Sequence, residues 1–280
     1  MKIVRNLSYL NKSQISSYSQ NGYLVLPNMI SHFEIAKLKR RAFEHIESWK
    51  PTSHPIFTTD QASRVFDDYF MKSAYHISFF LEESVKPPVT DKHNSINKIG
   101  HALHDLDNLF RKFSYRSEFK KIFQDLGYAK PQIVQSQYIL KAPKIGGYVK
   151  AHQDNSYIIT EPKSCTGIWV ALEDAGQNNA CLYAVPGSHS IGTRVLWQKM
   201  KNGEMKYSNS YEYSMEGGVC LEVKAGTVIL LNGDLVHWSD QNLSDKSRHA
   251  YTMHVVEGEF KWSEKNWLQR PEYFPFRIWD

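Results

Sequence analysis

Two kinds of hydrophobic pattern follow one another along the chain. In the first half, apolar residues recur three or four positions apart, as at Ile35, Leu38, Ala42 and Ile46, and this spacing predicts helices with one buried face. From Gln132 onward, short apolar runs are separated by turn residues, a pattern that predicts strands. The chain is therefore predicted to be mainly β, with helices flanking the strands.

The first 130 residues are predicted to be mostly helical and to pack on the β part. Cap sequences at Asn11 and Ser31 indicate helix starts, and Pro27 ends a short predicted strand. Residues 51–94 are predicted to be irregular apart from a strand at 77–81. Such a segment can cover the open end of a barrel, although packing is its plainer role. Further helices are predicted around residues 106–113 and 117–126.

The second half is predicted to hold the β core. Strands are predicted at residues 133–140, 157–160, 167–172, 181–185, 220–223, 227–231 and 248–256. Residues 194–218 are polar, which makes them the best candidate for a loop that sets substrate specificity. No repeat or linker marks a second domain. We expect a single domain over residues 1–280, with the β core at 131–257 and a C-terminal extension at 258–280.

Composition and charge narrow the class of protein. The chain is 41% hydrophobic and 22% charged, as is usual for globular proteins, and its net charge of +5 is mild. Basic residues are scattered except at Lys37–Arg41, where a solvated helix face is the plainer interpretation, so nucleic acid is not an expected partner. No run of eighteen or more apolar residues is present, so no membrane partner is expected.

The three cysteines, Cys165, Cys181 and Cys220, form no Cys-x-x-Cys pair. Their spacing argues against a disulfide framework or a structural zinc site and fits a reducing compartment. The start of the chain has no signal-peptide pattern, and residues 277–280 are not a peroxisomal address. We expect a cytoplasmic protein, with a monomer as the default oligomeric state.

The candidate chemistry lies in two short stretches, residues 151–154 and 235–239. His152 and Asp154 are two residues apart, and alternate side chains of a strand share one face, so both can reach one ion. His237 follows a second apolar run that ends in turn residues. Two histidines and one carboxylate form the facial triad of non-haem Fe(II) oxygenases, which leaves positions for a co-substrate and O2. The same ligands also suit a zinc hydrolase with an open position.

Arg248 follows the turn-like residues 242–245. A hairpin about this turn is predicted to set Arg248 opposite Ser239, near the end of the metal-binding strand. A guanidinium at that place can hold the far carboxylate of a dicarboxylic co-substrate such as 2-oxoglutarate. Each of these residues alone has a plainer structural interpretation. Their combination, in this order on strand-like segments, is what favours a site.

Three other histidines receive a structural interpretation. His101 and His104 have a spacing that can bind metal on a helix, but no third ligand is obvious nearby. His189 ends the turn at residues 186–189 and is predicted to be a hydrogen-bonded structural residue.

Several longer stretches resemble the phytanoyl-CoA dioxygenase family. The resemblance runs from about Gln20 to Gln269, and its motifs are residues 134–139, 146–147, 152–154, 167–174, 186–189 and 237–257. Three more stretches, residues 95–104, 241–248 and 266–269, are similar to a subgroup distinct from the peroxisomal phytanoyl-CoA hydroxylase. The resemblance implies a double-stranded β-helix core of the jelly-roll, cupin-like type, and chemistry that uses Fe(II), 2-oxoglutarate and O2.

The resemblance also implies roles for single residues. The residues that match the iron ligands are His152, Asp154 and His237. Those that match contacts of 2-oxoglutarate are Arg248 and Ser239, at its C5 carboxylate, and Lys98 and Trp169. Gln137 stands where relatives usually have methionine, and its amide brings a donor and an acceptor that need partners.

The expected function is therefore an Fe(II)- and 2-oxoglutarate-dependent dioxygenase. We expect it to hydroxylate an unidentified small-molecule or acyl substrate, releasing succinate and CO2. Asp154 favours hydroxylation, because halogenases of the wider family have a small residue there that leaves room for chloride. Phytanoyl-CoA itself is not the expected substrate. Two alternatives stay open: a sensor or binding module that holds iron and 2-oxoglutarate without hydroxylating, and a divalent-metal hydrolase.

Overall fold

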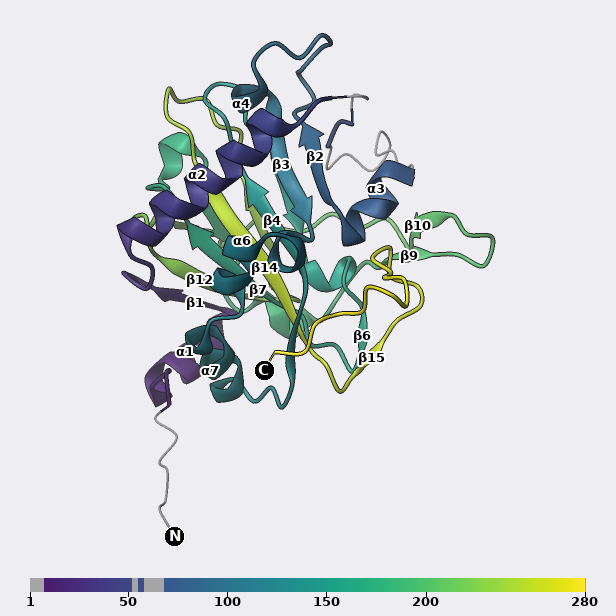
Figure 1. Cartoon of the computed structure of the whole chain (residues 1–280). Helices are drawn as coiled ribbons and strands as arrows, with labels where there is room; N and C mark the ends of the chain where they lie inside the picture. The colour runs from purple at the N-terminus through teal and green to yellow at the C-terminus, as the bar shows by residue number, and fades with distance from the viewer. Residues whose placement is uncertain (1–7, 52–54, 58–67, 280) are drawn as a thin grey trace.

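The computed structural model describes residues 8–51, 55–57 and 68–279 (Figure 1). Their strands form two main sheets and two short pairs. The large sheet has seven strands in the order β1 (Tyr23–Leu26), β12 (Val228–Asn232), β7 (Thr166–Ala171), β14 (Ala250–Glu257), β4 (Pro131–Ile139), β3 (Ile96–His101) and β2 (Ile77–Leu81). The small sheet has four, in the order β11 (Val219–Leu221), β8 (Leu182–Ala184), β13 (His237–Ser239) and β5 (Val149–His152). The short pairs are β10 (Met205–Tyr207) with β9 (Trp197–Lys199), and β15 (Lys261–Trp262) with β6 (Thr160–Glu161).

Most of the helices belong to the first half of the chain. They are α1 (Lys12–Asn21), α2 (His32–Ser48), α3 (Asp68–Lys72), α4 (Lys92–Ser95), α5 (Leu103–Leu106), α6 (Asn108–Ser114) and α7 (Ser117–Asp125), with 3-10 turns η1 (Ser73–Tyr75), η2 (Asp154–Ser156), η3 (Gln177–Asn179) and η4 (Ser188–Ile191). Asn11 and Ser31 cap α1 and α2, each in a complete capping box, so both predicted helix starts are confirmed.

Helices cover the outer face of the large sheet. Figure 1 shows α2 running diagonally across this sheet. The buried face of α2 consists of Ile35, Leu38, Ala42 and Ile46. These residues share one hydrophobic core with residues of β7, β12 and β14, namely Ile168, Val170, Val228, Leu230, Tyr251, Met253 and Val255. The helical spacing in the sequence therefore located the packing face of α2 correctly.

The other face of the large sheet is turned toward the small sheet. Because strand side chains alternate, the residues between those of the outer core point the opposite way. Trp169, Ala171, Ile229 and Leu231 form a second core with Leu182, Ala184 and Leu221 of the small sheet. Two sheets packed in this manner, with helices on one outer face, make the double-stranded β-helix that the family resemblance implied.

The structure differs from the sequence-based expectation in three segments. β1 and β2 confirm the strands predicted before Pro27 and at residues 77–81, whereas β3, which ends at His101, is a strand of the large sheet that was not predicted. Residues 68–75 form α3 and η1 within the segment predicted to be irregular; residues 1–7, 52–54 and 58–67 lie outside the described part. Residues 157–159 are not a strand, because the chain leaves β5 through η2 and only Thr160–Glu161 pairs, with β15.

No helix within the described residues is long and apolar enough to cross a membrane.

Leu230 is a direct test of the core between α2 and the large sheet. Its side chain is fully buried, so Leu230→Ala should lower the free energy of unfolding by about 2–5 kcal/mol through lost contacts and a cavity. Leu243→Ala is the matched control, since Leu243 is 67% exposed and its loss should cost about 0.5 kcal/mol or less. Chemical denaturation measures both values. Equal losses in the two variants would contradict this description of the core.

Candidate metal centre

The two histidines of the candidate site are brought together by strand pairing. His152 at the end of β5 is the register partner of His237 at the start of β13, and their ring centroids lie 4.3 Å apart. Nδ1 of His152 lies 2.8 Å from the carbonyl oxygen of Lys150, and Nδ1 of His237 lies 3.0 Å from that of Leu235. A carbonyl only accepts, so each Nδ1 carries the proton and each Nε2 has a free lone pair for a metal.

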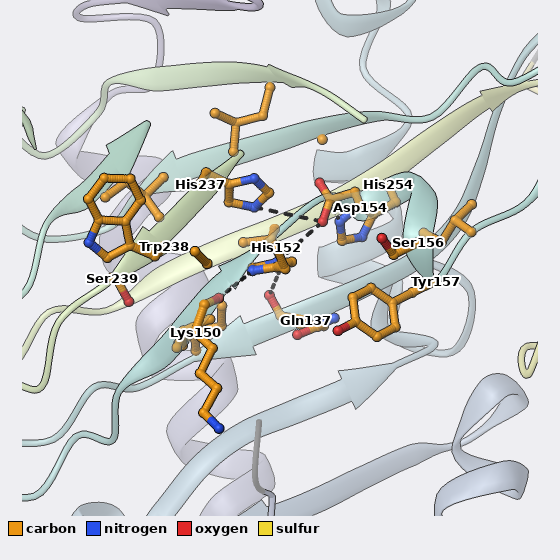
Figure 2. A pocket seen from close by; sticks show the side chains of 18 of the residues that line it. Gln137, Lys150, His152, Asp154, Ser156, Tyr157, His237, Trp238, Ser239 and His254 are labelled. Carbon is orange, nitrogen blue, oxygen red and sulfur yellow. Dashed lines mark hydrogen bonds and ion pairs between the residues drawn. The ribbon is translucent and has the colours of Figure 1, made fainter. Parts of the chain in front are cut away.

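Asp154 completes the group from the 3-10 turn η2, not from the strand. Its Oδ1 lies 3.7 Å from Nε2 of His152 and 3.7 Å from Nε2 of His237, and Figure 2 shows the three side chains converging in the pocket. The expectation that alternation along one strand aligns His152 with Asp154 is therefore wrong. Within the described residues, these three form the only group of histidine, cysteine and acidic side chains arranged to hold a metal ion.

Gln153, between His152 and Asp154 in the sequence, anchors the turn that positions Asp154. Its side chain is fully buried. Nε2 donates to the carbonyl oxygens of Asp234 at 2.6 Å and Gly192 at 3.0 Å. Oε1 accepts from the amide of Arg194 at 2.9 Å and from the Tyr213 hydroxyl at 3.2 Å. The turn that carries Asp154 is thus tied both to the strand connection before His237 and to the polar segment 194–218.

Burial and the neighbouring imidazoles shift the pKa of the Asp154 carboxyl in opposite directions. Burial alone would raise the pKa of its carboxyl, but the imidazoles of His254, His237 and His152 hold that pKa well below its usual range. Burial lowers the pKa of His152 to about 3. The site therefore presents an ionised carboxylate and a neutral His152 imidazole, the forms that bind a divalent cation.

His254 is a residue of the site that the sequence reasoning missed. Its Nε2 lies 3.3 Å from Oδ2 of Asp154, and its Nδ1 lies 2.8 Å from Nε2 of Gln135 on the neighbouring strand. Strand alternation could have predicted its place. Arg248, Thr252 and His254 are separated by even numbers of residues, so their side chains share one face of a strand, and all three line the same cavity.

Arg248 is fully buried and held from two sides. Its Nε donates to the carbonyl oxygen of Ala180 at 2.9 Å, and its guanidinium carbon lies 5.4 Å from the ring centroid of Trp169. Glu173 accepts hydrogen bonds from the Ser247 hydroxyl and the His249 amide, which fixes the backbone on both sides of Arg248. Nη1 of Arg248 is buried without a hydrogen-bond partner among the described residues. Burial lowers the pKa of Arg248 to about 10.

The predicted hairpin pairing of Arg248 with Ser239 is wrong. Ser239 pairs with Leu182 and Val149 in the small sheet, whereas the strand after Arg248 belongs to the large sheet. The chain crosses between sheets because buried Asn242 ties the turn to other segments, donating to the carbonyl oxygens of residues 141, 142 and 246. Ser239 and Arg248 nevertheless line the same cavity.

The remaining residues implied by the resemblance also line this cavity. They are Lys98 on β3, Gln137 on β4 and Trp169 on β7. The Gln137 amide has found a partner, because Nζ of Lys98 donates to its Oε1 at 3.1 Å. Lys98 also lies over the Phe57 ring, with 3.3 Å between Nζ and the ring centroid.

A cavity of about 700 Å³ opens from the candidate metal ligands. Part of the polar segment 194–218 forms its wall, namely Val195, Tyr207, Ser210, Tyr211, Glu212, Tyr213 and Met215. Besides Arg248, the cationic residues Lys98, Lys141 and Lys150 line it. Lys141 is buried, and burial together with the charge of Arg248 lowers its pKa to about 7. Its ammonium group donates to the carbonyl oxygens of Gly147 and Asp240.

The other histidines considered above make structural hydrogen bonds. His101 lies 2.8 Å from the Ser73 hydroxyl, and His104 lies 2.8 Å from the Ser136 hydroxyl. His189 bonds through Nε2 to the carbonyl oxygen of Ser19 at 2.9 Å, so its structural interpretation is confirmed.

A double-stranded β-helix that carries two histidines and an aspartate at a deep cavity defines the class of iron- and 2-oxoglutarate-dependent dioxygenases. The phytanoyl-CoA dioxygenase (PhyH) family model matches residues 18–250. The chain belongs to this family.

Two relatives show how extensive the similarity is. One is a phytanoyl-CoA dioxygenase of Arabidopsis thaliana, 44% identical over 269 residues that cover 93% of this chain and 94% of the relative. The other is phytanoyl-CoA dioxygenase domain-containing protein 1 of Danio rerio, 38% identical over 286 residues that cover 96% of this chain and 98% of the relative.

Solved structures agree on the fold. The iron-bound structure of EctD from S. alaskensis aligns with a TM-score of 0.66 and 19% identity, covering 96% of this chain and 84% of EctD. The non-heme alpha ketoglutarate dependent carbocyclase SnoK from nogalamycin biosynthesis aligns with a TM-score of 0.64 and 16% identity, covering 96% and 98%. At these identities the likeness concerns the fold alone.

Removal of one imidazole tests the metal centre. His237→Ala should abolish tight binding of Mn(II) or Fe(II), because two ligands remain where three converged. His189→Ala, which removes a histidine that bonds to Ser19 outside the cavity, should bind metal like the wild type. Anaerobic titration calorimetry measures the affinities, with circular dichroism as the check of folding. Wild-type affinity in His237→Ala would remove this residue from the metal site.

Proposed function

We propose that the protein is an Fe(II)- and 2-oxoglutarate-dependent hydroxylase of an unidentified small-molecule or acyl substrate. The observation that carries the proposal is the distribution of charge in one cavity. A carboxylate flanked by two imidazoles lies at one place and a buried, incompletely bonded guanidinium at another. The carboxylate with its two imidazoles suits a divalent cation. The guanidinium suits one carboxylate of a dicarboxylic acid whose other end reaches that cation.

The donor set fits iron. His152 and His237 would bind through Nε2 and Asp154 through Oδ1, a combination typical of non-haem Fe(II) sites. Iron and 2-oxoglutarate, when bound, supply the oxidising chemistry with O2 and yield succinate and CO2. The role of the protein would be to hold three ligands on one side of the ion and to leave the other side open to the cavity.

The unpartnered Nη1 of Arg248 fits a carboxylate. An orphaned donor on a buried cation is costly, and a carboxylate oxygen would both bond to it and neutralise the charge. The buried Ser239 hydroxyl lines the same region and would add a second donor. Trp169, with its ring against the guanidinium, would keep Arg248 oriented, and Lys98 with Gln137 would form a further side of the co-substrate site.

The tyrosine-rich wall at Tyr207 and Ser210–Met215 is the proposed substrate side. A volume of about 700 Å³ lies within the usual range of about 300–1,000 Å³ for small-molecule sites. The hydroxyl of Tyr213 is bonded to Gln153, so this wall is anchored to the turn that carries two of the metal ligands. Asp154 favours hydroxylation over halogenation, since its carboxylate occupies the position that a halide would need.

Replacement of Arg248 tests the co-substrate site. Arg248→Ala should weaken 2-oxoglutarate binding about ten- to hundredfold, because a charge-assisted pair worth about 1.5–3 kcal/mol is lost. Arg248→Lys should rescue only part of this loss, since an ammonium lacks the planar fork. Metal affinity should change little. Titration of 2-oxoglutarate into Mn(II)-loaded protein measures the effect, with the exposed Arg40→Ala as control.

An unchanged 2-oxoglutarate affinity in Arg248→Ala would place the co-substrate elsewhere.

A substrate search tests the hydroxylase proposal itself. Wild-type protein with Fe(II), 2-oxoglutarate and air should form succinate and raise the mass of at least one metabolite in a cell extract by one oxygen atom. The His237→Ala protein should do neither. Succinate and metabolites are measured by mass spectrometry. Binding of iron and 2-oxoglutarate without any succinate would favour the sensor instead, and 2-oxoglutarate-independent hydrolysis would favour the hydrolase.

A further inference from the structure

We propose that His254 is a positioning residue that keeps Asp154 monodentate toward the metal. The proposal rests on the proposed metal site and adds to it a device that preserves open coordination positions. A facial triad leaves three positions free only if its carboxylate uses one oxygen. A carboxylate that turned to bind through both oxygens would occupy a position that 2-oxoglutarate or O2 requires.

The two oxygens of Asp154 face different partners. Oδ1 lies at equal distances, 3.7 Å, from Nε2 of His152 and Nε2 of His237. Oδ2 instead faces Nε2 of His254 at 3.3 Å, and Figure 2 shows this third ring beside the carboxylate. One oxygen is therefore directed to the metal position, and the other is engaged by a side chain that belongs to no proposed ligand set.

Gln135 determines which nitrogen of His254 carries the proton. The amide Nε2 of Gln135 is a donor and lies 2.8 Å from Nδ1 of His254, so Nδ1 accepts. The proton of the neutral ring is then on Nε2, directed at Oδ2 of Asp154. The opposite tautomer would set a lone pair of Nε2 against a carboxylate oxygen. The pair Gln135 and His254 thus forms a fixed N–H donor toward one oxygen only.

The fold holds this donor in place. His254 is the register partner of Gln135 on β4 and of Gly167 on β7, and β14 has a bulge between His254 and Val255. Bulges near active sites re-aim side chains. Gly167 leaves the necessary room, because a Cβ at that position would lie 3.1 Å from Oδ2 of Asp154. The side chains of His254 and Asp154 are only 12% and 9% exposed, so water competes little for the contact.

Paired replacements of His254 test the proposal. His254→Leu should weaken Mn(II) binding about ten- to hundredfold, the usual effect of losing an outer partner of a ligand. It should also alter the visible charge-transfer band of the anaerobic Fe(II)–2-oxoglutarate complex, which depends on the ligands around the metal. His254→Gln retains an N–H donor on a side chain of similar reach and should restore both properties close to wild type. His189→Gln is the control for an unrelated histidine.

Each outcome of these measurements either supports or overturns the proposed role of His254. Wild-type metal affinity and an unchanged band in His254→Leu would overturn the proposal, and equal defects in the Leu and Gln variants would show a packing role instead of a donor role. Should His254→Leu fail to fold, Gln135→Met replaces it. That variant removes the donor to Nδ1 and should weaken Mn(II) binding in the same direction, so an unchanged affinity would overturn the proposal. Absence of metal binding by the wild type would overturn the proposed function as well, a pattern distinct from failure of the variants alone.

Discussion

The antiparallel register between β5 and β13 is the constraint on which the site depends. It pairs His237 with His152, two residues that lie far apart in the sequence. A slip by one residue would turn one of the two imidazoles to the opposite face of the sheet. The register is secured at the His152–His237 end of the strand pair, because Gln153 bonds to the carbonyl of Asp234 and the Asn155 amide bonds to that of Gly233. Backbone pairing and buried amides therefore position the candidate metal ligands without any ion.

The large sheet divides its residues between stability and chemistry by simple alternation. On β14, Tyr251, Met253 and Val255 belong to the core beneath the helices, whereas Thr252 and His254 line the cavity. On β7, Val170 belongs to the core beneath the helices, whereas Trp169 lines the cavity. Consequently Trp169, Thr252 and His254 each stand between two buried apolar residues that anchor the backbone. Rigid strands of this kind hold site groups more accurately than loops do, which suits a centre whose ligands must converge within a few ångströms.

Much of this arrangement could be predicted from the sequence, and the failures have identifiable physical causes. Helix caps, the packing face of α2 and the β core follow from local signals at short range. The crossing of the chain between Ser239 and Arg248 does not follow from local signals. A turn followed by a strand predicts a hairpin unless long-range bonds, here those of Asn242 to the carbonyl oxygens of residues 141 and 142, direct the chain elsewhere. The turn that carries Asp154 likewise depends on distant partners of Gln153. His254 could have been found by extending the alternation from Arg248, since strand geometry alone places it in the cavity.

The two charged centres of the cavity are prepared in opposite ways. The carboxylate of Asp154 is surrounded by donors and imidazoles, so its ionised form is stable without any ligand. The guanidinium of Arg248 is fully buried, and this burial lowers its pKa. Its Nη1 has no hydrogen-bond partner among the described residues. An anion that binds there relieves a cost already present in the folded chain, and by linkage it stabilises the fold by an amount that grows with the logarithm of its concentration relative to its Kd. The metal end is thus complete in its protein contacts, whereas the arginine end is completed only by a ligand, which gives the cavity a preferred direction for a molecule with a carboxylate at its far end.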